Sequence, residues 1–153
     1  MRRIRRVLVA NRGEIAIRIA RSARERAIEP VGVFAEDDLD APHRHAMPQS
    51  VALRGRGARA YLDAAQLIDA AVSTGCDAIH PGYGFLSEQA QFARDCAKVG
   101  LRFVGPRPEV LAELGDKALA RACAERCGVP VLPGKALESV DDAAALLASW
   151  PAG

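Results

Sequence analysis

Short apolar runs and longer helix-forming segments alternate along the first two-thirds of the chain, and this alternation constrains the fold more than any other feature. The short runs are mostly continuous, as in strands that are buried on both faces of a parallel sheet. Five of them are expected as strands: residues 6–10, 31–34, 50–53, 76–80 and 101–104. The helix-forming segments between them are residues 14–26, 61–73 and 87–99. Repeated strand–helix–strand units predict an α/β fold, a Rossmann-like parallel sheet with helices on both faces.

The pattern changes after residue 108, where helices replace the alternation. Three helices are predicted there, at residues 109–114, 116–127 and 140–149. We therefore expect two regions: a Rossmann-like domain over residues 1–114, and over residues 115–153 linker helices that begin a second region.

Composition and charge exclude several classes of protein. The 153 residues are 50% hydrophobic and 26% charged, which suits a globular core and not a disordered chain. The net charge of +2 is too balanced to indicate nucleic-acid binding, and the apolar runs are too short to span a membrane. We therefore expect neither a nucleic acid nor a membrane as a partner.

We expect a cytoplasmic location. The basic N-terminus is followed by an apolar run, residues 7–10, that is too short for a signal peptide. The four cysteines form no C-x-x-C pair and have no zinc-site spacing, so we interpret them as reduced thiols. No metal site is predicted.

Parallel α/β sheets bind ligands at the carboxyl ends of their strands, so the loops that follow the strands are candidate sites. The first loop, residues 11–14, together with Glu36 after the next strand, suggests a dinucleotide site. Such a site needs the pattern G-x-G-x-x-G, whereas this loop has a single glycine, and Glu14 lies where a phosphate would sit. The favoured interpretation is a tight strand-to-helix turn in which Glu14 stabilises the start of the helix.

The second loop, residues 80–88, combines two glycines, a proline and two aromatic residues. The glycines on either side of Tyr83 suggest a loop that presents an aromatic side chain closely against another group. Alternatively, Tyr83 and Phe85 cover the end of the sheet. Ser87 is expected to cap the helix that follows.

Lys117 is one of only three lysines among 21 basic residues, and it falls in the first turn of a predicted helix. Asp116 is expected to cap that helix. A cation at this end opposes the helix dipole by roughly 0.3–1 kcal/mol, which suggests that an anion docks beside it. The alternative is a solvated lysine that Asp116 partly neutralises.

Two other polar groups are weaker candidates. His43 and His45 suggest a metal pair, but no further ligand lies at a useful spacing, so a surface turn or short helix is favoured. One face of the first predicted helix is charged, and it is either solvated or a contact between subunits. Its members are Arg18, Arg21 and Glu25, the last two at i,i+4 spacing.

Four motifs occur in order along the chain: Val-Ala-Asn-Arg-Gly-Glu-Ile-Ala at 9–16, Ala-Ile-His-Pro-Gly-Tyr-Gly-Phe-Leu-Ser-Glu at 78–88, Phe-Val-Gly-Pro at 103–106 and Gly-Asp-Lys at 115–117. Together they resemble the N-terminal domain of biotin carboxylase, as found in acetyl-CoA, propionyl-CoA and pyruvate carboxylases. The resemblance covers residues 4–135, and it implies that residues 115–153 are the truncated start of an ATP-grasp region. It implies an ATP-grasp ligase, in which ATP phosphorylates bicarbonate to carboxyphosphate and the carboxyl group passes to N1 of biotin on a carrier protein.

The resemblance also implies roles for individual residues. Lys117 corresponds to a lysine that contacts the ATP phosphates. Tyr83 and Gly84 correspond to residues that line the biotin pocket. Arg18, Arg21 and Glu25 correspond to residues of a helix that lies near the family's two-fold dimer contact.

The chain departs from the family pattern where it ends. Family members continue beyond Trp150-Pro151 into a strand with a second phosphate-binding lysine, a glycine-rich loop, metal-binding glutamates and the catalytic arginine, whereas this sequence stops at Gly153. We therefore expect a fragment or a truncated open reading frame, with no catalytic or metal-binding residue of its own and no activity alone.

The resemblance implies that the complete enzyme uses ATP with Mg²⁺ or Mn²⁺ and takes carrier-bound biotin as its substrate, none of them bound tightly by this fragment. The implied partners are a biotin carboxyl carrier domain, a carboxyltransferase and a second copy in a homodimer. Two other functions stay open: a non-catalytic dimerisation or docking module, and the leading domain of another ATP-grasp ligase. The motif at 78–88 favours biotin carboxylase.

Overall fold

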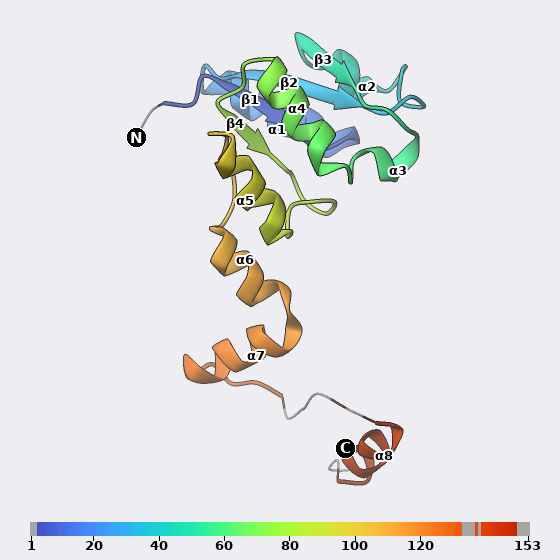
Figure 1. Cartoon of the computed structure of the whole chain (residues 1–153), viewed down its shortest axis with the longest axis vertical. Coiled ribbons are helices and arrows are strands. Elements are labelled where there is room, and N and C mark those ends of the chain that lie inside the picture. The colour runs from blue at the N-terminus through green and yellow to red at the C-terminus, as the bar shows by residue number, and fades with distance from the viewer. Residues whose placement is uncertain (1–2, 133–136, 138, 150–153) are drawn as a thin grey trace. The chain divides into compact units, whose positions relative to one another are not determined.

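A computed structural model describes residues 3–132, 137 and 139–149, and it contains a five-stranded parallel sheet (Figure 1). The strands are β1 (Arg6–Val9), β2 (Glu29–Phe34), β3 (Gln49–Ala52), β4 (Ala78–His80) and β5 (Arg102–Phe103). Their spatial order is β3-β2-β1-β4-β5, and every neighbouring pair is parallel. The predicted α/β class, with a Rossmann-like parallel sheet, is confirmed.

Helices cover both faces of this sheet. Residues alternate in direction along β1: Val9 packs against Ala16 and Ala20 of one helix, whereas Leu8 enters the larger core on the other face. The helix on the first face is α1 (Gly13–Glu25), and those on the second are α4 (Ala64–Ser73) and α5 (Ala90–Lys98). The short helices α2 (Pro42–His45) and α3 (Gly57–Ala60) lie in the connections.

Two predicted helix starts were wrong. The helix expected from Tyr61 begins at Ala64, because Asp63 caps it by accepting the backbone N–H of Gln66 at 3.0 Å, and Tyr61 is itself fully buried. The helix expected from Ser87 begins at Ala90.

Ser87 therefore does not cap α5. Its backbone N–H donates to the carbonyl of Gly84 at 2.9 Å, so residues 85–88 form a turn ahead of the helix.

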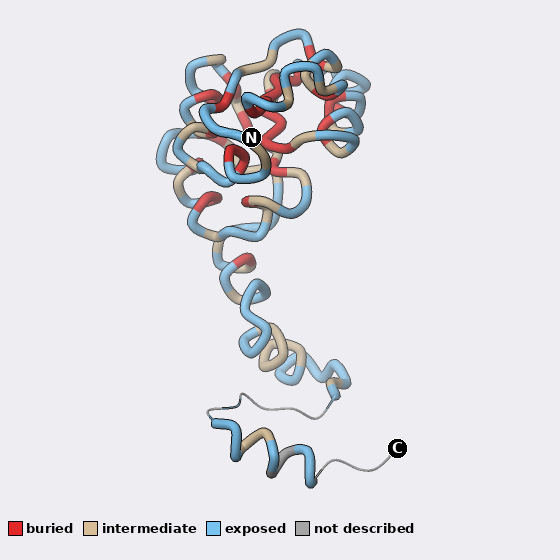
Figure 2. The backbone as a smooth tube through the Cα atoms, turned by 90° about the vertical axis from the view of Figure 1, so that its right-hand side faces the viewer, coloured by how far each residue is buried: buried red, intermediate tan, exposed pale blue. Residues whose placement is uncertain are grey.

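The chain forms two compact units, residues 1–112 and 113–153. The later helices are α6 (Pro108–Gly115), α7 (Lys117–Arg126) and α8 (Val140–Ser149). Within the described residues, those that are buried fall between Val7 and Leu111, and α7 has none (Figure 2). That residues 115–153 begin an ATP-grasp region stays a prediction.

Across the described helices, none has the length and apolar character needed to cross a membrane.

Candidate functional site

The order of the strands reverses between β1 and β4, and this places two loops side by side. From β1 the chain builds outward through β2 and β3, then returns to add β4 and β5 on the other side. Val9 lies opposite His80 in the ladder, so residues 10–13 and 81–89 leave the sheet next to each other. Such a switch point is where open α/β sheets bind ligands.

Asn11 joins these two loops. Its side chain is only 2% exposed, and its Nδ2 donates to the carbonyls of Pro81 at 2.7 Å and Tyr83 at 2.9 Å. Its Oδ1 accepts the backbone N–H of Arg12 at 2.9 Å. The residue therefore uses every polar hydrogen of its amide on the loop.

Sequence reasoning missed this role of Asn11 and treated residues 11–14 only as a turn or a nucleotide loop. One signal was present: Asn11 is the only asparagine of the chain, and it directly follows a buried strand. The tight strand-to-helix turn itself is seen, because α1 starts at Gly13, which has a φ of +60°.

His80 and Gly82 hold the loop from the other side. The Nδ1 of His80 accepts the backbone N–H of Gly82 at 3.0 Å, and burial lowers the pKa of His80, which keeps the ring neutral and able to accept. Gly82 has a φ of +70°, and a Cβ there would lie 2.5 Å from Nδ2 of Asn11. The position therefore requires glycine for two independent reasons.

The two aromatic residues of the loop have different environments. The ring of Phe85 lies 5.5 Å from that of Tyr61 and packs on the main core, whereas Tyr83 is 68% exposed. Gly84 has a φ of +65°, with open space where a Cβ would be. Of the two predicted alternatives, Phe85 covers the end of the sheet and Tyr83 does not.

A buried polar network lies beside this site. The hydroxyl of Tyr61 donates to Oδ2 of Asp38 at 2.7 Å and accepts the backbone N–H of Ala35 at 3.1 Å. His43 Nε2 lies 3.2 Å from the same hydroxyl, and Arg12 lies 3.6 Å from Asp38. Burial raises the pKa of Tyr61, with the Asp38 hydrogen bond adding to it, so the phenol stays protonated.

The structure partly corrects the interpretation of His43 and His45. The short helix is present as α2, but His43 is buried in the core instead of lying on the surface. Its partner is Tyr61, 18 positions further along the chain. In residues 3–132, 137 and 139–149, no cluster of three or more His, Cys, Asp or Glu side chains is suited to a metal ion.

The charged face of α1 is exposed. Glu14 lies in the first turn, as expected, and pairs with Arg18 at 3.4 Å. This is the i,i+4 ion pair that the structure shows on α1, whereas Arg21 and Glu25 form none with the described residues. All four side chains belong to residues with large exposed fractions, so the face is open for contact.

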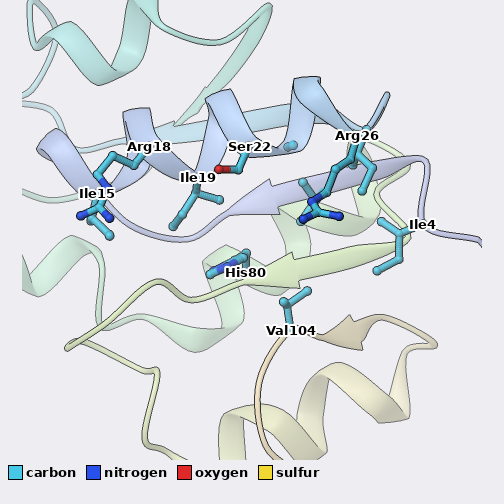
Figure 3. A pocket seen from close by; sticks show the side chains of 11 residues that line it. Ile4, Ile15, Arg18, Ile19, Ser22, Arg26, His80 and Val104 are labelled. Carbon is cyan, nitrogen blue, oxygen red and sulfur yellow. The ribbon is translucent and has the colours of Figure 1, made fainter.

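A groove of about 470 Å³ lies between α1 and the strands β1 and β4 (Figure 3). Figure 3 shows Arg18 and Arg26 toward its two ends and Ile19 between them. His80 also lines the groove, so the residue that supports the loop on one side faces this groove as well. The remaining lining is mainly apolar.

Lys117 occupies the first turn of α7. Asp116 caps the helix as predicted, because its Oδ1 accepts the backbone N–H groups of Ala118 at 2.8 Å and Leu119 at 2.9 Å. Lys117 is exposed, and among the described residues no carboxylate lies within ion-pair distance of it. Its ammonium group is therefore available to an anion.

Comparison with known proteins identifies a matching family and several similar carboxylases. The family model described as "Biotin carboxylase, N-terminal domain" matches residues 3–111. The chain is 48% identical over 133 residues to the biotin-dependent acyl-coenzyme A carboxylase alpha3 subunit of Mycobacterium leprae. That match covers 86% of the chain and 22% of the relative.

Solved structures agree with the sequence matches. The biotin carboxylase domain of a single-chain bacterial carboxylase has a TM-score of 0.90 at 50% identity, over 95% of this chain and 34% of that one. The biotin carboxylase domain dimer of Hydrogenobacter thermophilus 2-oxoglutarate carboxylase, in complex with MgADP, ADP and bicarbonate, has a TM-score of 0.92 at 37% identity. That match covers 97% of this chain and 33% of the other. The chain thus spans about a third or less of the proteins named here.

Burial of His43 predicts a pH-dependent stability. Burial holds the pKa of His43 below its usual 6.5, so below pH 6.5 the unfolded chain binds a proton that the folded chain does not. Stability is therefore complete above pH 6.5 and falls as the pH falls. Between pH 7.5 and pH 5.5, the unfolding free energy of His43→Gln should fall by about 1 kcal/mol less than that of wild type, as measured by urea titration. The exposed control, His45→Gln, should keep the wild-type loss; equal losses in all three proteins would contradict the prediction.

The contact between Gly82 and Asn11 predicts unequal effects of two similar substitutions. Gly82→Ala and Gly84→Ala each place a side chain at positive φ, which costs about 1–2 kcal/mol. Only Gly82→Ala also forces the buried amide of Asn11 to move. We expect it to lower the unfolding free energy by at least about 1 kcal/mol more than Gly84→Ala, because two buried hydrogen bonds are disturbed. Equal losses in chemical denaturation would show that the contact does not matter.

Proposed function

The chain belongs to the family of biotin carboxylase N-terminal domains, and from this premise we propose that it forms the leading domain of a biotin-dependent carboxylase. As the family resemblance implies, that enzyme would use ATP and bicarbonate to carboxylate biotin on a carrier protein. The observation that carries the proposal is the loop of residues 80–88, which is fixed at the switch point of the sheet with Tyr83 exposed.

Tyr83 and Gly84 are proposed to line the biotin pocket. Biotin is a polar ureido ring fused to an apolar sulfur-containing ring, so an exposed aromatic ring beside a glycine backbone is a suitable surface for it. Three features support this role: the exposed ring of Tyr83, the open space at Gly84 and the fixed backbone between Pro81 and Tyr83.

Lys117 is proposed to contact the phosphates of ATP. Its ammonium group sits at a helix start, where an anion offsets the unfavourable interaction with the helix dipole. Lys117 is one cation, and the described residues include no ligand set for the Mg²⁺ or Mn²⁺ that accompanies ATP. As the family resemblance implies, we propose that the metal ligands and the catalytic groups come from the rest of the enzyme.

The substrates and partners of the complete enzyme follow from the same proposal. The Hydrogenobacter relative was solved with MgADP and bicarbonate and as a dimer, which supports ATP, bicarbonate and a homodimer here. The exposed charged face of α1 would make the dimer contact, through Arg18, Arg21 and Glu25. A biotin carboxyl carrier domain and a carboxyltransferase complete the proposed assembly.

Substitution of Tyr83 tests the biotin pocket. In a complete carboxylase that carries this chain as its N-terminal segment, Tyr83→Ala should raise the KM for free biotin by roughly 3- to 10-fold, because a ring contact is lost. The KM for ATP should not change. Because Tyr83 is exposed, unfolding free energy should change by no more than about 0.5 kcal/mol.

Phe85→Ala is the matched control, since Phe85 packs on Tyr61 and should act through stability instead. Steady-state kinetics and thermal melting of both variants separate the roles. A Tyr83→Ala enzyme that melts earlier but keeps its KM for biotin would refute the pocket assignment.

Substitution of Lys117 tests the phosphate contact. Lys117→Ala should leave the stability of the chain within about 0.5 kcal/mol, as exposed positions do. In the complete carboxylase it should raise the Kd for ATP roughly tenfold or more, because hydrogen bonds to charged groups contribute about 1.5–3 kcal/mol. Lys98→Ala removes another exposed lysine and should leave the Kd unchanged. Calorimetric titration with ATP measures both; equal Kd values would refute the role of Lys117.

A further inference from the structure

We propose that Asn11 is a positioning residue for the biotin pocket: its side-chain amide sets the place of Tyr83 and Gly84 without touching the substrate. This inference rests on the proposed function, because it takes those two residues as the lining of the pocket.

The backbone of the loop depends on Asn11 for its fixed position. Among the described residues, one backbone–backbone hydrogen bond involves residues 81–84, from Ser87 to the carbonyl of Gly84. The carbonyls of Pro81 and Tyr83 are held instead by the two hydrogens of the Asn11 amide. Removal of that amide would leave both acceptors without their donor in a largely buried place.

The contact is directed at the backbone of the loop and not at its packing side chains. Phe85 and Leu86 anchor the far part of the loop in the main core, and Tyr83 is exposed. Asn11 contacts neither Phe85 nor Leu86 by hydrogen bond, but it holds the carbonyl of the residue whose ring faces solvent. Asn11 therefore affects the position of the exposed Tyr83 ring more than the packing of the core.

The geometry leaves little freedom for an alternative loop position. Gly82 lies against Asn11, so closely that a Cβ would meet its Nδ2 at 2.5 Å, and the N–H of Gly82 is bound by His80. The segment is thus held between a side chain that follows β1 and one that ends β4. A small change in the donor pattern of Asn11 should displace the loop as a unit.

Asn11→Asp is the informative substitution, because it keeps the shape and removes the donors. A carboxylate at this position would face two carbonyl oxygens. Burial and these acceptors favour the neutral acid, which raises the pKa of the new carboxyl group, and the neutral acid donates one hydrogen bond. The defect should therefore become smaller as the pH falls.

Two measurements test the inference, with Asn11→Ala as a second variant that adds no charge. Val31→Ala is the control, because Val31 is fully buried in β2 and its truncation destabilises the core without removing a hydrogen bond to the loop. The first measurement is amide hydrogen exchange of Gly82 in this chain, because its N–H is bound by Nδ1 of His80. Asn11→Asp and Asn11→Ala should speed exchange there by about tenfold or more relative to Val31→Ala, because hydrogen bonds that hold the loop are lost.

The second measurement is the KM for free biotin in the complete carboxylase. Asn11→Asp should raise it about tenfold at pH 8 with the KM for ATP unchanged. The ratio of its KM to that of wild type should fall between pH 8 and pH 6, whereas the ratio for Val31→Ala should stay flat.

The outcomes separate this inference from the function on which it rests. Exchange in the Asn11 variants that matches Val31→Ala would overturn the positioning role, whatever the kinetics show. Faster exchange with an unchanged KM for biotin would also overturn it, provided that Tyr83→Ala raises that KM. If Tyr83→Ala has no effect on biotin, the pocket assignment fails and the proposed link from Asn11 to biotin fails with it.

Discussion

The neighbouring positions of β1 and β4 are the constraint on which the rest of the site depends. The last backbone bond between them runs from the N–H of Ala10 to the carbonyl of His80 at 2.9 Å. Beyond that point the side chain of Asn11 takes over from the backbone and binds the next carbonyls of the β4 loop. A side-chain amide thus extends the pairing of two strands into the region where a ligand would bind.

Local patterns were enough to predict the parallel sheet and most helices, because buried strands and amphipathic helices differ in their apolar periodicity. The two helix starts were wrong where capping signals competed. The helix expected from Tyr61 begins after Asp63 instead, because the Asp63 carboxylate accepts a backbone N–H of the first turn and so caps the helix there. Ser87 matched the preference for a capping residue, but its loop is drawn into the core by Phe85 and Leu86.

The site was predicted only in part. Residues that belong to local motifs were identified, whereas contacts between residues far apart in the sequence were missed. Tyr83, Gly84 and Lys117 were selected from local motifs and the family resemblance, and their roles stay predictions. The contacts of Asn11 span 70 and 72 positions, so they depend on a strand order that no local pattern reveals. The burial of His43 depends in the same way on Tyr61, which the sequence placed in a helix.

The close approach of Gly82 to Asn11 also limits how this loop is used in protein design. The loop of residues 80–84 cannot be transferred by itself, since its conformation depends on Asn11, which follows another strand, as much as on its own glycines. A designer who grafts it onto a different Rossmann-like scaffold would need an asparagine directly after the adjoining strand. Without this asparagine, the same five residues would keep their sequence and lose their conformation.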